Sequence, residues 1–590
     1  MVVSFDSNAN PFPSITRRVD RWLLAANPLK PVHRSKPPLS FPPLIPPELW
    51  GLIIHHACLL YHDPLDTSKD LSFFDLNSPS VQLDTYRNAM TLKTTLALVC
   101  REWNDFVRAG LYEFVWISRA AQAKALARTL LMEYVERKKA LQARTEGRMG
   151  QKDRISSGCY VRRLHIETPI LERCNPADIR TILDYTPSLY IYSDHHSLQR
   201  SMFNDCPDPR STPEEILRLI AHPQLRRLGW TTYGSVPFSQ RISPLINGHT
   251  DLMRLQYLEL SCWSPNPHSV SPESLSDANT RHLALKHPMF LSLPSLKALK
   301  VSLDNNTFAT IASWDMPLLT NLSVLSADFS YTGPGFQAFF TAHGDKLLQL
   351  ELGHSSSSIE EYYLTAPHHP NAAPGAAPAG PATPISLATF CPNLREVICS
   401  ADAEWHWQSP DWITPHILLP SHPNVELIGI RDIDKRLRED PDFEHAGVTP
   451  YFPLFEQIVC LLRRDAFPSL RFVRDLSVES QEMRVVASQA AQHIGPPPSQ
   501  TASTTSASSF AGPNPKRVLT FWTRVVEKCR ERGVWIEDYT GMNLTARSLM
   551  RAGLMQADDE EDVVVKVVKA KKKIGQGGLK RLSRAFGRSR

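Results

Sequence analysis

The 590-residue sequence contains ten cysteines but no C-x-x-C pair and no tight cysteine spacing. This absence argues against a disulfide framework or a zinc site and favours reduced cysteines in the core of a cytoplasmic or nuclear protein. The sequence also has no run of the about 18 to 20 apolar residues that a membrane span needs, and its first residues show no basic cluster followed by an apolar segment. We therefore expect an intracellular protein, cytoplasmic or nuclear, that does not enter a membrane.

The short motifs of the common enzyme classes are missing as well. We find no G-x-S-x-G, no G-x-x-x-x-G-K-[ST], no G-x-G-x-x-G and no H-E-x-x-H. Histidine pairs occur at 55–56, 195–196 and 368–369, but none has Cys, Asp or Glu at the spacing of a metal site. We therefore expect a protein that is not an enzyme, with no catalytic residues, no metal and no cofactor.

Excess charge is small and lies at one end of the chain. Lys and Arg number 65 against 60 Asp and Glu, but residues 566–590 hold ten of the basic residues and no acidic one, which leaves 55 basic residues elsewhere. The body is therefore slightly acidic, and we expect no nucleic-acid groove on it. Residues 541–590, acidic at 558–562 and then basic, are expected to be disordered. Three interpretations of the basic part stay open: a nuclear-import signal, a short membrane-surface helix, or a solvated charged run.

Most of the chain carries a recurring pattern in which apolar residues stand at the first, fourth and sixth positions of a short unit. Five of eight matches have proline two positions before the first apolar residue, as does a partial ninth match, which is far more often than chance allows. Alternate positions of a strand point to one face, so we interpret each match as a short strand facing a core. The matches begin at Val161, Leu225, Leu255, Leu296, Leu319, Leu347, Leu394 and Val425, and the partial one begins at Leu470.

Helix-like segments precede several of these units, as at 336–343, 455–464 and 518–532. A helix, a turn and a strand repeated along the chain form a solenoid, and this pattern resembles leucine-rich repeats over residues 158–540. Two low-complexity segments, 366–386 and 495–515, have too few apolar side chains to become ordered and are expected to be disordered insertions. The expected fold class is α/β: a small N-terminal helical module followed by an irregular leucine-rich-repeat-like solenoid.

Two helices are predicted in that module. Ile45–Ile54 reads I-P-P-E-L-W-G-L-I-I, with proline suited to a first helical turn, and residues 92–106 place apolar side chains on one face of a second helix. V-C-R-E-W at 99–103 and V-W-I at 115–117 follow. These pieces, in this order, resemble an F-box. We expect a flexible arm at 1–40, the F-box-like module at 41–117 with a loop insertion at 62–91, and a helical bridge at 118–150.

The resemblance implies the substrate-recognition subunit of an SCF-type cullin-RING E3 ubiquitin ligase. Its F-box would bind the Skp-family adaptor and thereby the cullin complex, while the repeats would hold a protein target. Such a subunit acts by proximity, because it raises the effective concentration of the target near the charged ubiquitin-conjugating enzyme. The alternative is a leucine-rich-repeat interaction scaffold without a ligase role. The resemblance places adaptor contacts at Pro46, Leu49, Ile53, Ile54, Val99 and Leu111, and the module's own core at Cys100 and Trp103.

Three tryptophans lie close together after one predicted strand, at Trp405, Trp407 and Trp412. Loops of a solenoid often carry its binding residues, and aromatic side chains are frequent anchors. Two interpretations stay open: these rings bind the target, or they cover the core beneath an insertion.

Overall fold

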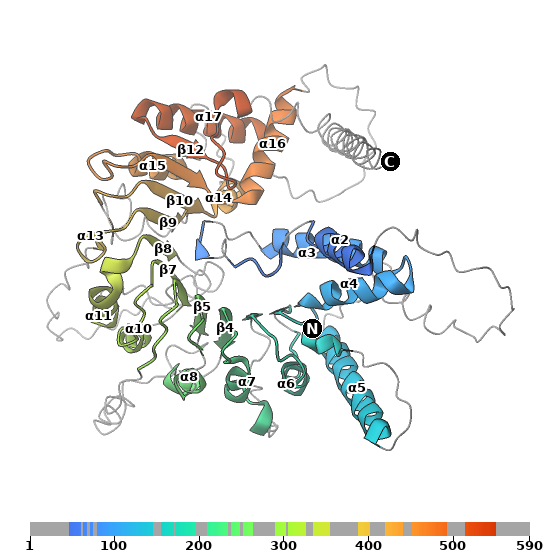
Figure 1. Cartoon of the computed structure of the whole chain (residues 1–590). Helices are drawn as coiled ribbons and strands as arrows, with labels where there is room; N and C mark the ends of the chain where they lie inside the picture. Colours follow the sequence, from blue (N-terminus) through green and yellow to red (C-terminus); the bar gives the residue numbers. More distant parts are fainter. Residues whose placement is uncertain are drawn as a thin grey trace, which may run out of the picture. The chain divides into compact units, whose positions relative to one another are not determined.

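The computed structural model describes residues 46–60, 63–67, 71–74, 79–145, 155–169, 172–195, 209–233, 238–247, 252–263, 290–302, 305–325, 334–353, 387–401, 419, 421–439, 451–492 and 514–549 (Figure 1). The chain divides into two compact units, residues 1–53 and 54–590. The described part of the first unit begins helix α2 (Pro47–Cys58). The predicted arm at 1–40, the insertion at 366–386 and the three tryptophans at 405–412 lie outside the described residues.

The second unit is built on one open sheet of twelve strands, which lie in chain order and pair in parallel throughout. This arrangement confirms the α/β class and the repeat-like architecture. The strands are β1 (Phe114–Ile117), β2 (Arg163–Glu167), β3 (Ile191–His195), β4 (Arg227–Tyr233), β5 (Tyr257–Trp263), β6 (Ala298–Ser302), β7 (Asn321–Leu325), β8 (Gln349–Gly353), β9 (Glu396–Ser400), β10 (Leu427–Arg431), β11 (Phe472–Asp475) and β12 (Trp535–Glu537).

Helices alternate with the strands, because a parallel pair needs a crossover connection. Those between β2 and β8 line the outer side of the curved sheet (Figure 1). The described helices of this unit, besides the end of α2, are α3 (Pro79–Ala97), α4 (Arg101–Glu113), α5 (Ala120–Thr145), α6 (Pro176–Asp184), α7 (Pro213–Ile220), α8 (Phe238–Asn247), α10 (Asn305–Ile311), α11 (Pro334–His343), α13 (Leu387–Phe390), α14 (Ile433–Glu439), α15 (Phe452–Leu461), α16 (Val478–Gln492) and α17 (Pro515–Arg532). None of the described helices is long and apolar enough to cross a membrane.

One continuous core fills the space between the sheet and its helices. Every apolar residue of the eight predicted matches is buried in it, which confirms the interpretation of the pattern as inward-facing strand positions. Helix α17 adds the predicted face of Val518, Trp522, Val525 and Cys529.

The prolines that mark the repeats occupy turns just before the strands. In these turns the first apolar residue donates its N–H to the carbonyl three residues earlier, as from Leu225 to His222 (3.0 Å) and from Leu394 to Cys391 (3.2 Å). The prolines at 223 and 392 thus stand second in a β-turn, where a φ fixed near −65° fits. The proline sets up the strand by forming this turn.

Two expected boundaries move in the N-terminal half. Helix α3 begins at Pro79, so the later part of the expected loop insertion at 62–91 is helical. The sheet begins at β1, well before residue 158, because Phe114–Ile117 pairs in register with Arg163–Ile166. The N-terminal helical module therefore runs directly into the first strand.

Two further boundaries move near the C-terminus. Residues 495–513 of the expected insertion lie outside the described residues, and its last two residues belong to α17, since Asn514 caps this helix by accepting the N–H of Lys516 (3.1 Å) and Pro515 is the first helical residue. Residues 541–549, expected to belong to a disordered tail, are ordered: Leu544 donates its N–H to the carbonyl of Ile536 in β12 (2.8 Å). The rest of the tail, 550–590, lies outside the described residues.

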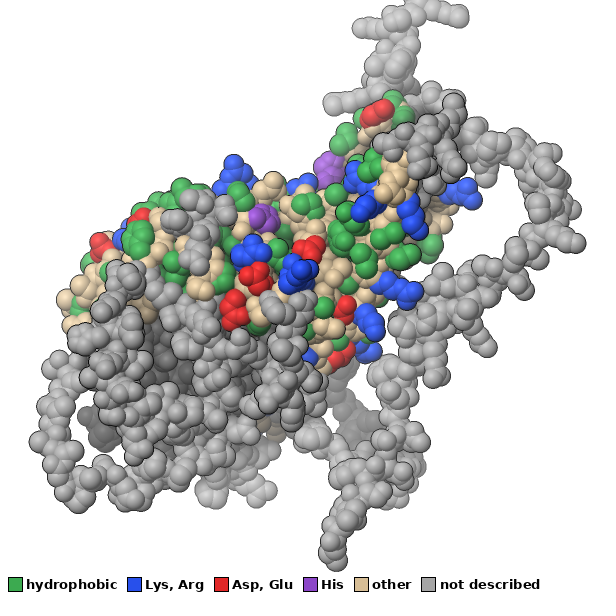
Figure 2. Space-filling model, turned by 90° about the horizontal axis from the view of Figure 1, so that it is seen from below, with side chains coloured by type: hydrophobic (Ala, Val, Ile, Leu, Met, Phe, Trp, Pro, Cys, Tyr) green, Lys and Arg blue, Asp and Glu red, His purple; other side chains and the backbone are tan. Residues whose placement is uncertain are grey.

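Charges of both signs are mixed over the described surface seen in Figure 2, where basic and acidic side chains lie interspersed among apolar ones. A protein that binds nucleic acid through its body usually gathers basic residues on one face. The mixed pattern on this side agrees with a body whose basic residues do not outnumber its acidic ones.

Candidate functional site

A small core holds the helices of the N-terminal module together, and its buried residues are Ile54, Cys58, Ala97 and Val107. Trp103 packs against this core, as predicted. Cys100 does not belong to it: this residue is the N-cap of α4, and its Sγ accepts the N–H of Trp103 (3.4 Å).

A buried lysine ties the second and third helices of the module to each other. The Lys93 ammonium on α3 donates a hydrogen bond to the carbonyl of Gly110 on α4 (2.9 Å). Burial lowers the pKa of Lys93, although Cys58 and Glu113 nearby act in the opposite direction. The group serves the module's own packing, because its side chain is turned away from solvent.

The predicted adaptor-contact residues of the first unit lie at the beginning of α2. Leu49 and Ile53 are 49% and 50% exposed, and Leu52, which the motif did not single out, is 55% exposed. Pro46 is exposed, and its carbonyl accepts the N–H of Leu49 (3.0 Å) in the first turn. Residues three and four apart share one side of a helix, so these three side chains form an apolar stripe in contact with solvent.

The remaining predicted contact residues belong to the second unit and divide into two groups. Val99 is 57% exposed in the turn between α3 and α4, next to Leu98 at 80%. Ile54, in contrast, is buried in the module's core, and Leu111 is half-buried against it. The side chain of Ile54 already fills the space between helices, so a packing role replaces its predicted contact, whereas half-buried Leu111 keeps part of its surface exposed and its contact stays a prediction.

Polar and aromatic contacts fasten the module to the first repeats. Arg108 on α4 forms an ion pair with Glu133 on α5 (2.8 Å), and the Glu133 carboxylate also accepts the N–H of Ser157 (2.7 Å). Tyr86 on α3 accepts the N–H of Trp116 in β1 (3.4 Å). Side chains from α3 and α4 thus hold the module against the beginning of the solenoid.

The face of the sheet opposite the core, called here the inner face, carries paired charges. Lys300 and Glu259 lie 2.9 Å apart on neighbouring strands, and Glu351 pairs with Arg431. Burial acts to raise the pKa of the Glu259 carboxyl, but the charge of Lys300 foremost outweighs it and holds that pKa at about 2. The same face carries a separate apolar cluster, formed by Tyr257, Ala298 and Ile398 with Leu427 and Leu476 at its edge.

Part of the expected loop insertion lies on this inner face. Leu71, Phe73 and Phe74 belong to the inner-face cluster, and Phe73 has no exposed surface. Nothing in the sequence pattern pointed to this contact, because more than 180 residues separate Phe73 from Tyr257, the ring it packs against (centroids 6.4 Å apart). The only available signal was two adjacent phenylalanines in a stretch otherwise read as a loop.

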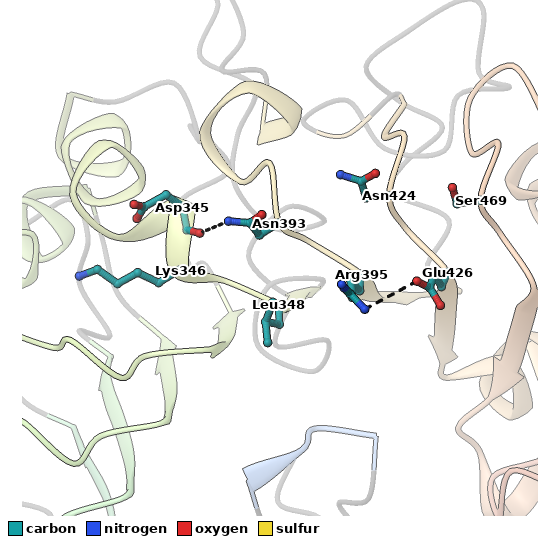
Figure 3. Close-up of a pocket in the computed structure, with 8 residues that line it drawn as sticks. All are labelled: Asp345, Lys346, Leu348, Asn393, Arg395, Asn424, Glu426 and Ser469. Atoms are coloured by element: carbon teal, nitrogen blue, oxygen red, sulfur yellow. Dashed lines mark hydrogen bonds and ion pairs between the residues drawn. The ribbon is translucent and has the colours of Figure 1, made fainter.

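A polar hollow of about 510 Å³ lies where strands β8 to β11 begin (Figure 3). Its polar side chains are used between repeats: Asn393 donates to the carbonyl of Asp345 (2.7 Å), and Ser469 donates to that of Pro423 (2.6 Å). Figure 3 shows Arg395 directed toward Glu426, 3.9 Å away. These bonds join each turn to the preceding repeat, so we assign the hollow to repeat stacking.

The described cysteines are all free, and burial raises the pKa of Cys391, Cys399 and Cys529 to about 12. Thiols with such pKa values are neutral and unreactive at physiological pH. Within the described ranges, no group of three or more His, Cys, Asp or Glu side chains could hold a metal ion.

The fold therefore defines an open, all-parallel α/β protein with a repeat-like architecture, consistent with leucine-rich-repeat-like units, and with helices at its N-terminal end. No protein-family model matches the sequence, and a search of the curated proteins finds no match either.

Proposed function

We propose that this protein is the substrate-recognition subunit of an SCF-type cullin-RING ubiquitin ligase. Its N-terminal module binds a Skp-family adaptor, and its repeats bind a protein target. The observation that carries the proposal is the solvent-exposed apolar stripe of Leu49, Leu52 and Ile53, because Leu49 and Ile53 stand at positions where the F-box resemblance expects adaptor contacts and Leu52 lies beside them. Leaving three large apolar side chains in water gains nothing for the chain itself, whereas burying them against a partner is favourable.

The attachment of the module to the solenoid supports the same function. A ligase receptor contributes by holding its target at a defined distance from the catalytic subunits. The Arg108–Glu133 ion pair and the bond from Trp116 to Tyr86 restrict movement between the helices and the first strands. A bound target would therefore stay in a restricted position relative to α3 and α4.

Co-purification with a Skp-family adaptor tests this proposal. The intact chain is expected to capture the adaptor stoichiometrically. The double variant Leu49→Asp with Ile53→Asp is expected to lose at least about tenfold in affinity, since charges replace two central apolar contacts. Met253→Asp is the matched control, because Met253 is 52% exposed in a turn of the solenoid and should not affect capture.

The outcomes separate the ligase receptor from the interaction scaffold. Capture that survives in the folded double variant would refute the assigned contact residues. Absence of capture by the intact chain would refute the ligase role and leave a repeat scaffold. Val99→Asp tests the predicted contact of the second unit by itself. A comparable loss of adaptor affinity is expected, because Val99 is 57% exposed and is a predicted adaptor contact.

A further inference from the structure

The inner face recognises the backbone of residues 71–73 through side chains from three strands. Asn321 of β7 donates to the carbonyl of Leu71, Gln349 of β8 accepts the N–H of Phe73 (2.7 Å), and Arg431 of β10 donates to the carbonyl of Phe73 (2.6 Å). Bonds to main-chain groups do not depend on the side chains of the bound segment. Any peptide that adopts the same backbone conformation can satisfy them.

Two aromatic positions add selectivity. Phe73 packs beside the Tyr257 ring, with centroids 6.4 Å apart. Phe74 lies against Gly429, where an added Cβ would come within 2.5 Å of its ring, and beneath the Arg474 guanidinium, 5.3 Å from the ring centre. Glycine in the middle of a strand leaves room for an aromatic ring, and the arginine adds a cation–π contact.

Residues 71–74 leave one polar group of the inner face without a hydrogen bond. Ser323 stands between Lys300 and Glu351 in the same register row, and its hydroxyl is buried without a hydrogen-bond partner among the described residues. A buried polar group without a partner is unfavourable. A ligand that offered a polar group there would satisfy a site that residues 71–74 leave unsatisfied.

We propose that the inner face is a binding site for a peptide segment with two adjacent aromatic residues, and that Leu71–Phe74 occupies it as an internal competitor. The inference rests on the target-binding half of the proposed function and specifies the class of target. A competing segment of the same chain has a high effective concentration, so a target must displace it. The apparent affinity for the target is then the intrinsic affinity multiplied by the fraction of molecules whose site is free.

A labelled peptide of residues 69–76, K-D-L-S-F-F-D-L, tests the site with the full-length purified chain. The variant Phe73→Ala with Phe74→Ala vacates the site and is expected to bind this peptide at least about tenfold more tightly than the unaltered chain. Adding Gly429→Val to that variant should abolish the gain, because the side chain fills the space of the second ring. The control peptide K-D-L-S-A-A-D-L should not bind. A folded vacated variant that binds both peptides equally would overturn the proposal.

A second measurement needs no altered core. In the unaltered chain, hydrogen exchange of residues 71–74 should rise when the peptide is added up to about 1 mM, because the free peptide then competes with the internal segment. No rise at that concentration would overturn the proposal, since the segment would then be a permanent part of the fold. Both assays omit the adaptor. Peptide binding without adaptor capture would therefore refute the ligase role alone, and the reverse result would refute the peptide site alone.

Discussion

The replacement Gly429→Ala tests directly whether residues 71–74 lie on the inner face. A Cβ at this position would come within 2.5 Å of Cε1 of Phe74 and 2.8 Å of Cδ1 of Leu476. The leucine methyl can rotate away, but the phenylalanine ring must shift as a whole. Such overpacking typically costs about 1–3 kcal/mol in unfolding free energy. Gly229→Ala is the matched control, because its nearest neighbours lie at an ordinary 3.5 Å, and we expect a change below about 0.5 kcal/mol.

A double-mutant cycle isolates the contact. Phe74→Ala alone should cost about 3–5 kcal/mol, since a buried aromatic side chain is lost. With the ring absent, Gly429→Ala should cost little more, so the two changes should show a coupling of about 1–3 kcal/mol. Urea unfolding of the four chains, followed by circular dichroism, measures these values. Additive changes would refute the reasoning, because the ring would then not lie over Gly429 in solution.

Two further predictions concern buried charges. Burial foremost lowers the pKa of both His165 and His343 to about 4, whereas a histidine in the unfolded chain has its ordinary pKa of 6.5. Between these two pH values the unfolded chain binds protons that the folded chain does not, so the unfolding free energy should fall as the pH falls from 6.5 toward 4, by up to about 1.4 kcal/mol per pH unit for each histidine. Equal stability at pH 7 and pH 5 would contradict this prediction. Arg484→Met should lower the free energy of unfolding, measured by thermal denaturation, by about 3–5 kcal/mol, because it leaves the fully buried Asp475 carboxyl without its ion pair. Adding Asp475→Asn should recover part of that loss.

The repeats could be predicted because their signal is local. Each strand places apolar residues at fixed spacing, and its turn often carries proline, so both features can be read within about six residues. Strands β1, β3 and β12 carry no match to the pattern, and in β3 the core positions hold Tyr192 and Asp194. The tyrosine hydroxyl donates to that carboxylate (3.1 Å), so a polar pair takes the place of the usual aliphatic residues. A search for apolar residues at fixed spacing does not find a strand whose core positions hold such a polar pair.

The candidate site was predictable only in part, for a different reason. The motif named Leu49, Ile53 and Val99, which are exposed, but also Ile54, which is buried inside the module, and Leu111, which is half-buried against its core. A helical spacing alone does not tell which neighbouring position faces the core and which faces solvent. Two adjacent phenylalanines were the only local signal for the docking of residues 71–74, since its partners lie hundreds of residues away on separate strands.

The segment on the inner face also changes how the solenoid responds to stress. In a stack where each repeat contacts only its neighbours, the repeats can unfold one after another from either end. Residues 71–74 contact β5, β7, β8 and β10 together. Strands five places apart are thereby clamped to one short segment. The repeats from β5 to β10 should consequently unfold together as one unit, and residues 71–74 should set the curvature of this part of the sheet.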